Sequence, residues 1–370
     1  MIFATHKESF LRALDRVSPV VKSNPRSIDV LQGVKLETIG TDVFVTASSP
    51  MANTRVLVEG AVVAGSGEVA VNFDKLRDRV SKSGESMRLE VKEKFLRITS
   101  SDDQRLGIPI NDLREFPAVE WAQPEESYGL ETSHFVGLLK TSSSVTSEVT
   151  SLNPAFLQIQ IRDQFLWGAN SVSYQRIPIN CNPSLNSSIP TATIHAMTKF
   201  IQDSGGDKVW LSQVGKEHVV VSVGKDQFQA VPLALDFPNL SQAFDHTKVR
   251  VSESLKIDRK KLVTALAKAK TSADSYGRVT LVLQGTALTT LLIKTRSDHG
   301  DWYEEEIAPV IWEGKEGRTL TFNIDTLLSF LRSFKEEDVI LELGDDFKGD
   351  LTPVLCVEGD HVAILNQFRV

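Results

Sequence analysis

The sequence predicts an α+β protein in which one kind of domain, built from two helices packed on antiparallel sheet, occurs three times. Short strings of residues recur at constant spacing along the chain, which is the signature of internal repeats. Within each repeat, segments with the 3.6-residue periodicity of an amphipathic helix alternate with segments in which every second residue is apolar, as in strands. A chain of 370 residues is also too long for one ordinary domain.

The repeats are marked by two features. Phe116-Pro117 returns as Phe237-Pro238, 121 residues later, and the amphipathic segment that begins at Phe73 returns at Ile194 with the same spacing. A third copy of that segment begins at Ile324, 130 residues after the second. A longer acidic hairpin near residues 301–306 accounts for the extra length. We therefore expect three domains, with boundaries at residues 1–122, 123–249 and 250–370.

Each repeat opens with a predicted helix. In the first of these helices, Phe10, Leu14 and Val17 recur at three- and four-residue spacing and form one apolar face. Alternating strands follow, such as residues 34–37 in the first repeat and 279–283 in the third. A second helix and further short strands complete each repeat. The three opening helices are expected at Lys7–Val17, Ser133–Ser143 and Arg259–Lys270.

Composition predicts a cytoplasmic protein. No run of about 18 apolar residues exists, so no membrane-spanning helix is expected. The N-terminal residues lack the basic start and apolar core of a secretion signal. Only two cysteines occur, Cys181 and Cys356, and so sparse a pair fits a reducing compartment better than a disulfide framework.

The net charge of −7 argues against a nucleic-acid-binding protein unless the cations are concentrated on particular elements. The helix at residues 259–270 carries five basic residues and no acidic one, and Lys261 and Lys268 share a face. Such segregation places positive potential on one surface, where phosphates are bound without reading base sequence. The candidate phosphate contacts are Arg12, Arg16, Lys22, Arg26, Lys75, Arg79, Lys82, Lys140, Lys199, Lys261, Lys268, Arg332 and Lys335.

Sequence signatures of catalysis are absent. There is no phosphate-binding loop, no dinucleotide-binding glycine motif and no nucleophile elbow. The histidines are scattered without zinc-ligand spacing. Residues 345–350 lack the ligand order of a calcium loop, and the acidic residues 301–306 fit a charged strand edge better than a cation site. We expect no catalytic residue, cofactor or metal.

Two other functions stay open on this evidence. The first is a repeat-built binding scaffold that never meets DNA and uses its acidic strands as the working surface. The second is a hydrolase whose site is assembled from scattered residues such as His218, Ser222 and Asp226.

The order and spacing of several segments resemble the β sliding clamp of bacterial DNA polymerase III over essentially the whole chain. They are Phe10–Ser18, which resembles the first pore helix, the domain-closing Glu115–Pro117 and Asp236–Leu240, and the C-terminal Ala363–Val370. The chain looks like a divergent member of that family.

The resemblance implies a DNA polymerase processivity factor without catalysis of its own. Two copies would join head to tail into a closed ring around double-stranded DNA. Partners would be the replicative DNA polymerase, the clamp loader, and repair or translesion polymerases that bind through short linear peptides. The contact between copies would involve Leu106, Ile108, Thr271 and Ser272.

The resemblance also implies a pocket for partner peptides. Asn170 stands where the family usually has Asp, and Gln242 stands where Arg is frequent, so the preferred peptide is expected to differ. Core packing is an equally simple reading of Leu152 and Ile364. The matching positions are Leu152, Ala169, Ser171, Arg176, Pro238, Gln242, Ala243, Ile364, Leu365 and Phe368.

Overall fold

The computed structural model describes residues 1–22, 29–102, 104–122, 128–146, 153–170, 173–215, 218–249, 251–284, 289–315, 317–344 and 353–367. The chain divides into two compact units. Unit 1 comprises Met1–Gly137 and Asn180–Ala234, and unit 2 comprises Leu138–Ile179 and Leu235–Val370. Among the helices in these ranges, none has both the length and the apolar run that crossing a membrane requires.

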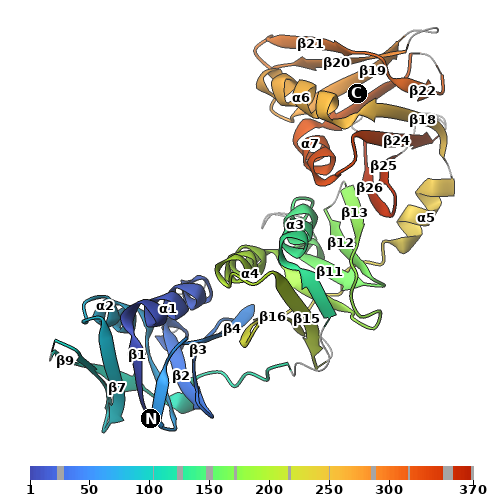
Figure 1. The fold of residues 1–370 in the computed structure, drawn as a ribbon. Coiled ribbons are helices and arrows are strands. Elements are labelled where there is room, and N and C mark those ends of the chain that lie inside the picture. Colours follow the sequence, from blue (N-terminus) through green and yellow to red (C-terminus); the bar gives the residue numbers. More distant parts are fainter. Residues whose placement is uncertain are drawn as a thin grey trace. The chain divides into compact units, whose positions relative to one another are not determined.

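The order of the elements is the same in three successive parts of the chain (Figure 1): a strand and a helix, then strands, then a second helix and a closing group of strands. The first part contains β1 (Ile2–His6), α1 (Lys7–Lys22), β2 (Gly33–Ile39), β3 (Asp42–Ser48), β4 (Ala52–Leu57), β5 (Val62–Gly65), β6 (Glu68–Asn72), α2 (Phe73–Ser81), β7 (Ser86–Lys92), β8 (Phe95–Ser100) and β9 (Arg105–Asn111).

The second part contains β10 (Tyr128–Glu131), α3 (Thr132–Ser143), β11 (Gln158–Arg162), β12 (Phe165–Ala169), β13 (Ser173–Pro178), β14 (Ser187–Pro190), α4 (Thr191–Asp203), β15 (Lys208–Val214), β16 (His218–Val223) and β17 (Asp226–Ala230), and is followed by α5 (Ser241–Val249). The third contains β18 (Val251–Asp258), α6 (Arg259–Ala269), β19 (Arg278–Gln284), β20 (Thr290–Arg296), β21 (Trp302–Ile307), β22 (Ile311–Glu313), β23 (Thr319–Asn323), α7 (Ile324–Ser333), β24 (Asp338–Gly344), β25 (Val354–Glu358) and β26 (His361–Leu365). Short 3-10 turns lie at Asp29–Gln32, Leu113–Glu115, Pro154–Phe156 and Lys270–Ser272.

The second helices bury the same positions at the predicted spacings of 121 and 130 residues. These positions recur at three- and four-residue intervals, so they line the face that packs on the sheet. They are Phe73, Leu76 and Val80 in α2, Ile194, Met197 and Ile201 in α4, and Ile324, Leu327 and Leu331 in α7.

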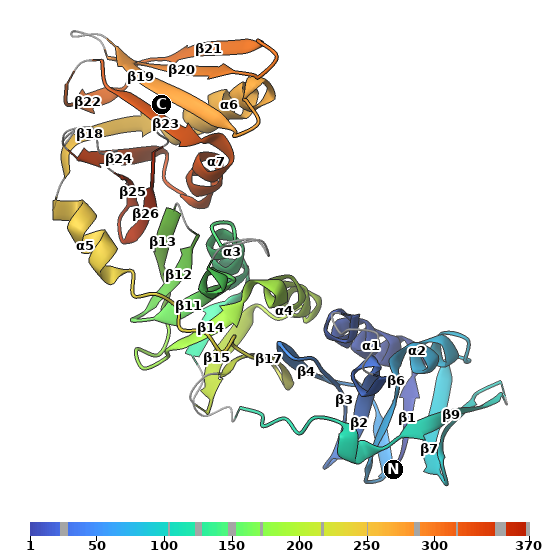
Figure 2. The ribbon, with the colours of Figure 1, turned by 180° about the vertical axis from the view of Figure 1, so that it is seen from behind.

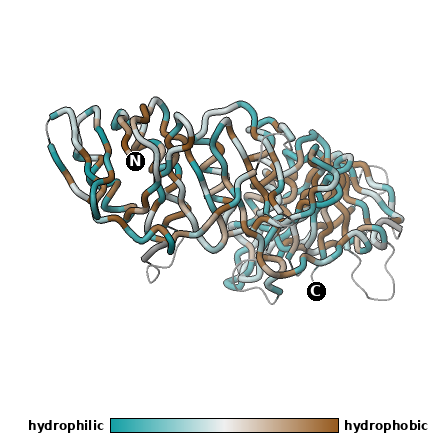
Figure 3. Tube along the Cα trace, turned by 90° about the horizontal axis from the view of Figure 1, so that it is seen from below, coloured by the Kyte–Doolittle hydropathy of each residue, from teal (hydrophilic) through white to brown (hydrophobic). Residues whose placement is uncertain are grey.

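Unit 1 is built on one continuous antiparallel sheet with the strand order β10-β15-β16-β17-β4-β3-β2-β6-β9-β8-β7-β1-β5. Phe3 of β1 meets Phe10 of α1 edge to face, with ring centroids 6.0 Å apart. The first and second parts of the chain join where β4 pairs with β17. Hydrophobic residues alternate with hydrophilic ones along much of the chain (Figure 3), as expected for strands with one buried face.

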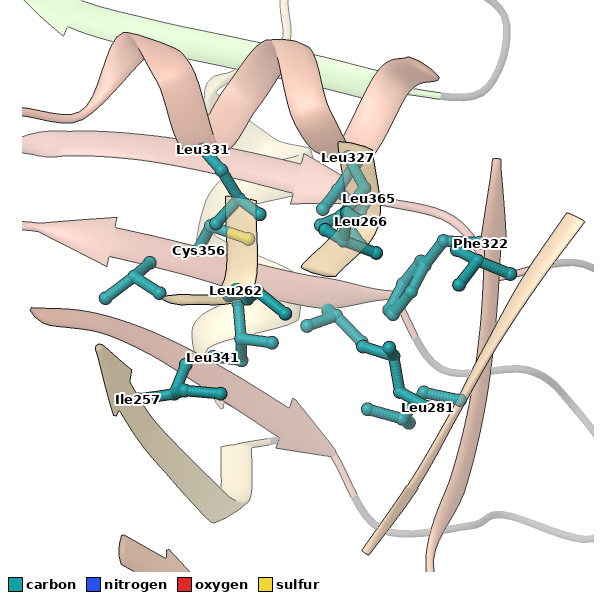
Figure 4. Packing of buried hydrophobic residues seen from close by; sticks show 14 of the residues in the cluster. Ile257, Leu262, Leu266, Leu281, Phe322, Leu327, Leu331, Leu341, Cys356 and Leu365 are labelled. Atoms are coloured by element: carbon teal, nitrogen blue, oxygen red, sulfur yellow. The ribbon is translucent and has the colours of Figure 1, made fainter. Parts of the chain in front are cut away.

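In unit 2, one sheet contains the strand order β11-β12-β13-β26-β25-β24-β18-β22, and a second has the order β21-β20-β19-β23. The second and third parts of the chain join where β13 pairs with β26. Gly168 lets α3 approach β12, because a Cβ atom there would lie 2.5 Å from the carbonyl oxygen of Ser142. The largest core of this unit fills the space beneath α6 and α7 (Figure 4), where Leu262, Leu266 and Leu331 pack with strand residues such as Leu341.

Candidate nucleic-acid and partner surfaces

The helix α2 presents a row of exposed cations. Its N-terminus is capped by Asn72, whose side chain accepts a hydrogen bond from the backbone N–H of Lys75. Lys75, Arg79 and Lys82 are exposed and lie on one helix face, as their spacing predicts. Within the described part of the chain, only Lys82 of these three forms an ion pair, with Asp78 at 2.7 Å. The face therefore keeps a positive charge.

On α1, Arg12 and Lys22 are exposed. Arg12 lies 3.6 Å from the carboxylate of Glu59, and since both side chains are largely exposed this pair holds the guanidinium only weakly. The second part of the chain is poorer in cations. Lys140 of α3 is exposed, and Lys199 of α4 pairs with Asp203 at 2.7 Å. Arg26 lies outside the described residues.

In unit 2, α6 is capped by Asp258, whose carboxylate accepts from the N–H of Lys261. Lys261 and Lys268 are both exposed. Lys268 reaches Glu305 of β21 at 3.2 Å, so part of its charge is neutralised. Arg332, in the last turn of α7, and Lys335, just beyond it, are exposed.

The assignment of Arg16 as a phosphate contact was wrong, because the side chain is buried. Its guanidinium pairs with Asp226 at 2.6 Å and also donates to the hydroxyl of Ser204. It lies over the ring of Phe200, 5.2 Å from the centroid. Arg12 and Arg16 share a helix face by sequence spacing, but only Arg16 is covered by α4 and β17 from the next repeat.

An aromatic cluster lies on one face of the sheet of β11, β12, β13, β26 and β25 in unit 2. Trp167 of β12 meets Phe244 of α5 edge to face, with centroids 5.6 Å apart. The guanidinium of Arg176 lies between the rings of Phe165 and Phe244, 5.2 Å from each centroid. In both views of the ribbon, α5 lies beside β13 and β26 (Figures 1 and 2). The buried members are Phe156, Trp167, Ala169, Phe237, Leu240, Phe244, Leu355, Val362 and Ile364.

Arg176 is the polar centre of this cluster. Its side chain is half-buried, and its buried Nε has no hydrogen-bond partner among the described residues. Contact with the two rings holds the guanidinium in place, and among the described residues no ion pair balances its charge. An anionic or carbonyl group of a ligand could satisfy it.

The structure brings several predicted pocket residues together in this cluster. Ala169 and Ile364 are buried members, and Leu365 is buried on the opposite face, in the core beneath α6 and α7. In the structure, Ile364 is therefore a core residue, as the core-packing interpretation expects. Pro238 and Ala243 are half-buried and Gln242 is exposed. Leu152, Ser171 and Phe368 lie outside the described residues.

The aromatic members of the cluster were not predicted. Phe165 and Trp167 are two positions apart on β12 and thus share a face, and Phe244 follows the second Phe-Pro pair by a few residues. A period-two pattern of aromatic residues, read together with the apolar residues after Phe237, could have revealed them.

The four predicted contacts between copies differ in exposure. Leu106 of β9 is half-buried and Thr271 is exposed, while Ser272 is half-buried. Ile108 is 1 % exposed, so assigning its side chain to an interface was wrong: it faces the core of its own domain.

The hydrolase interpretation finds no assembled site. His218 and Ser222 are four residues apart on β16, which is about 13 Å of extended strand. Asp226 is engaged by Arg16 and by the backbone N–H of Leu57. Among the residues that the structure describes, no three His, Cys, Asp or Glu side chains are grouped as a metal site would need. Residues 345–350 lie outside that set.

The fold is that of the sliding clamps. Over the full length of both chains it matches the DNA polymerase III subunit beta from Pseudomonas aeruginosa, with a TM-score of 0.80 at 19% identity. It also matches the DNA polymerase sliding clamp from Bacillus subtilis, with a TM-score of 0.82 at 16% identity, covering 100% of this chain and 99% of that one. Residues 1–120 match the family model of the DNA polymerase III beta subunit, N-terminal domain. This match covers the first 120 of the 370 residues, and the likeness to the solved clamps over the whole chain is one of fold. No curated protein matches the sequence.

Proposed function

We propose that this protein is a DNA polymerase processivity factor that encircles duplex DNA and tethers a polymerase to it. The match of residues 1–120 to the N-terminal domain of the DNA polymerase III beta subunit supports the role of an accessory subunit of a DNA-directed DNA polymerase rather than of an enzyme. The observation that carries the proposal is the repetition of exposed cations on equivalent helices of an acidic protein. We expect it to act in the cytoplasm, with domain boundaries at residues 1–122, 123–249 and 250–370.

The mechanism is topological. Exposed lysines and arginines such as Lys75, Arg79 and Lys261 attract phosphates without contacting base edges, so the protein can slide. The buried Arg16 takes no part in this attraction. A polymerase attached to a ring that cannot dissociate sideways stays at high effective concentration near the primer end and rebinds before it diffuses away.

The two joins within the chain support the proposed ring closure. By their order, β4, β13 and β21 are equivalent, and so are β9, β17 and β26. β4 pairs with β17 and β13 pairs with β26. Of these six strands, β21 and β9 are therefore the two that take part in neither join. Among the described strands, β21 pairs only with β20, and β9 is contacted along residues 105–109 from one side only, through β8. We therefore place β21 of one copy against β9 of the other.

Charge supports this head-to-tail pairing. Glu304 and Glu306 are exposed on β21, with Glu304 paired to Lys294 at 3.0 Å, and Arg105 of β9 and Arg97 of the neighbouring strand β8 are exposed near the other edge. Opposite charges on two different edges favour a heterologous contact, and two such contacts close a ring of two copies.

The aromatic cluster around Arg176 is the proposed docking site for short linear peptides of the replicative polymerase, the clamp loader, and repair or translesion polymerases. Buried aromatic side chains and an orienting guanidinium are the elements that anchor peptides in such sites. Because Gln242 is exposed beside this cluster, its amide can select a polar group of the peptide.

Retention on circular DNA tests the topological function. The protein, loaded on nicked circular DNA, should stay bound through a high-salt gel-filtration step and should be released when a restriction enzyme linearises the circle. Equal retention on circular and linear DNA would refute encirclement. A matched variant with charge reversal of Lys75 and Arg79 should load less well but show the same dependence on linearisation.

A further inference from the structure

A hollow of about 330 Å³ lies in unit 1 where β5 separates from β1. β5 pairs with β1 only at Ile2, Phe3 and Ala4, and the chain before it turns at Gly60, whose φ is 70°. Past Ala4, β1 therefore runs on without β5 beside it. Gly60 and Val62 form one wall, and β1, β7 and the end of β8 form the floor. This feature is called the β1–β5 hollow below.

Polar side chains from the three strands meet on the floor in two adjacent rows. In one row, Arg88 lies directly opposite Ala4 on one side and Thr99 on the other. In the next, Ser86 lies opposite His6, and the N–H of Ser101 donates to the carbonyl of Ser86 at 2.9 Å. The rows are two residues apart along each strand, so their side chains share a face about 7 Å apart.

This face is the one turned away from α1. The intervening residues of the same strands, Phe3, Leu89 and Ile98, are buried, and Phe3 packs on Phe10 of α1. His6, Ser86, Arg88, Thr99 and Ser101 are exposed. The hollow is therefore separate from the cations on α2 that face duplex DNA in the proposed function.

The chemistry of the lining is suited to an oxyanion. It offers one guanidinium, one imidazole and several hydroxyl groups, and no lining residue is an aspartate or glutamate in a protein of net charge −7. Within the described residues Arg88 forms no ion pair, while Ser86 Oγ lies 3.3 Å from His6 Nδ1. An arginine that is free to bind in bidentate fashion, flanked by hydroxyl donors, matches the geometry of phosphate.

We propose that the β1–β5 hollow binds the phosphate group of a small phosphate ester, of the size of a nucleoside monophosphate. Ala4 leaves room above the strand for the phosphate, and Arg88, Thr99 and Ser86 surround that space. Val62, 67 % exposed, offers an apolar wall for the organic part of the ligand. The wall at Gly60 and Val62 closes one side, which favours a small molecule over a continuous nucleic-acid strand.

The test uses the full chain and three probes: inorganic phosphate, deoxyadenosine monophosphate and a single-stranded oligonucleotide. Binding is followed by backbone amide shifts and by calorimetry. Deoxyadenosine monophosphate should move the signals of residues 86–88 and 99–101. Arg88→Ala should weaken its binding about tenfold or more and Thr99→Val by less. The matched control is Lys92→Ala, because Lys92 is an exposed cation on the same face of β7 as Arg88 and lies outside the hollow.

Three outcomes would overturn the proposal. The first is no binding at millimolar concentration, and the second is an equal loss with Arg88→Ala and Lys92→Ala. The third is binding of the oligonucleotide alone in an Arg88-dependent way, which would make the hollow a strand-binding surface. Arg88→Ala should leave retention on circular DNA unchanged, so this proposal and the clamp function fail separately.

Discussion

The guanidinium of Arg16 and the carboxylate of Asp226 form a buried ion pair between the first and second repeats. One N–O distance is 2.6 Å, and the side chains are 6% and 12% exposed. Asp226 also accepts a hydrogen bond from the backbone N–H of Leu57 at 2.6 Å, so one carboxylate connects α1, β4 and β17. Burial raises the pKa of Asp226, and the charge of Arg16 opposes that rise. The join of the repeats therefore depends on a polar contact as well as on strand pairing.

Breaking this pair from one side should destabilise the protein strongly. Arg16→Met leaves the Asp226 carboxylate buried without its counter-charge, and losses of about 3–5 kcal/mol are typical of that situation. The double variant Arg16→Met/Asp226→Leu should lose less free energy of unfolding than the two single variants lose together. Urea unfolding followed by circular dichroism measures both. Arg12→Ala is the control, since its pair with Glu59 is exposed and should contribute little. Additive losses would contradict the coupling.

Stability should fall between pH 6.5 and about 4 because of His361. Burial lowers the pKa of His361 from 6.5 to about 4, with Lys335 contributing, and outweighs the Glu358 carboxylate 3.9 Å away. The unfolded chain therefore takes up a proton in this window that the folded chain does not, which costs about 1.4 kcal/mol per pH unit below 6.5. The raised pKa of Asp226 acts in the opposite sense, so the informative quantity is the difference between wild type and His361→Gln. A constant difference across this window would refute the assignment.

Charge reversal on the helices should weaken DNA binding in a salt-dependent way. Lys261→Glu removes an exposed cation of α6, and Lys75→Glu one of α2. Each should reduce the slope of log affinity against log salt by about 1 if one phosphate contact is lost. Fluorescence anisotropy on duplex DNA at several salt concentrations measures this. Lys256→Glu, on a strand and paired with Asp338, should leave the slope unchanged. Equal slopes for all three variants would mean that the helices do not face DNA.

Association of two copies should depend on charges at the two proposed edges. Glu304→Lys/Glu306→Lys should raise the dissociation constant by tenfold or more, because like charges then face Arg97 and Arg105 of the other copy. Sedimentation velocity across a dilution series measures the shift. Combining these substitutions with Arg97→Glu/Arg105→Glu should restore association. If the charge-swapped protein stays monomeric, the two edges do not meet.

Partner peptides should require the stacked guanidinium. Arg176→Lys keeps the charge but loses the planar group held between Phe165 and Phe244, and should weaken binding of a polymerase-derived peptide by tenfold or more. Fluorescence polarisation of a labelled peptide provides the measurement. Arg55→Lys is the matched control, because Arg55 is stacked in the same way on Phe44 and Trp121 in unit 1. Equal effects of both changes would argue against a specific site at Arg176.

Much of the fold could be predicted from local periodicity. The helices at residues 7–17, 133–143 and 259–270 all exist within one residue at their starts, because apolar faces and caps are local signals. The first helix nevertheless runs on to Lys22 through Pro19, where a sequence rule would end it. Val20 and Val21 are buried, and their packing offsets the backbone hydrogen bond that proline cannot make.

The candidate sites were harder to predict because they depend on contacts between distant segments. Arg12 and Arg16 are indistinguishable by spacing. Arg12 is exposed, whereas Arg16 is covered by Phe200 and Asp226, which lie much further along the chain. Trp167 was not predicted because strand alternation leads one to expect that one face of β12 is polar. In the structure, residues of the segment from Phe237 to Phe244 cover that face. Ile108 was predicted to be exposed but is buried. Which face of β9 is buried depends on its pairing with β8, and residue spacing alone does not predict that pairing.

The claim that two copies close into a ring is tested most directly by negative-stain imaging of the full-length protein after mild crosslinking. The account predicts closed rings of two chains with a central opening, present in wild type and lost in Glu304→Lys/Glu306→Lys. Particles that stay open, single and unchanged by that substitution, at concentrations where the protein is retained on DNA, would contradict it.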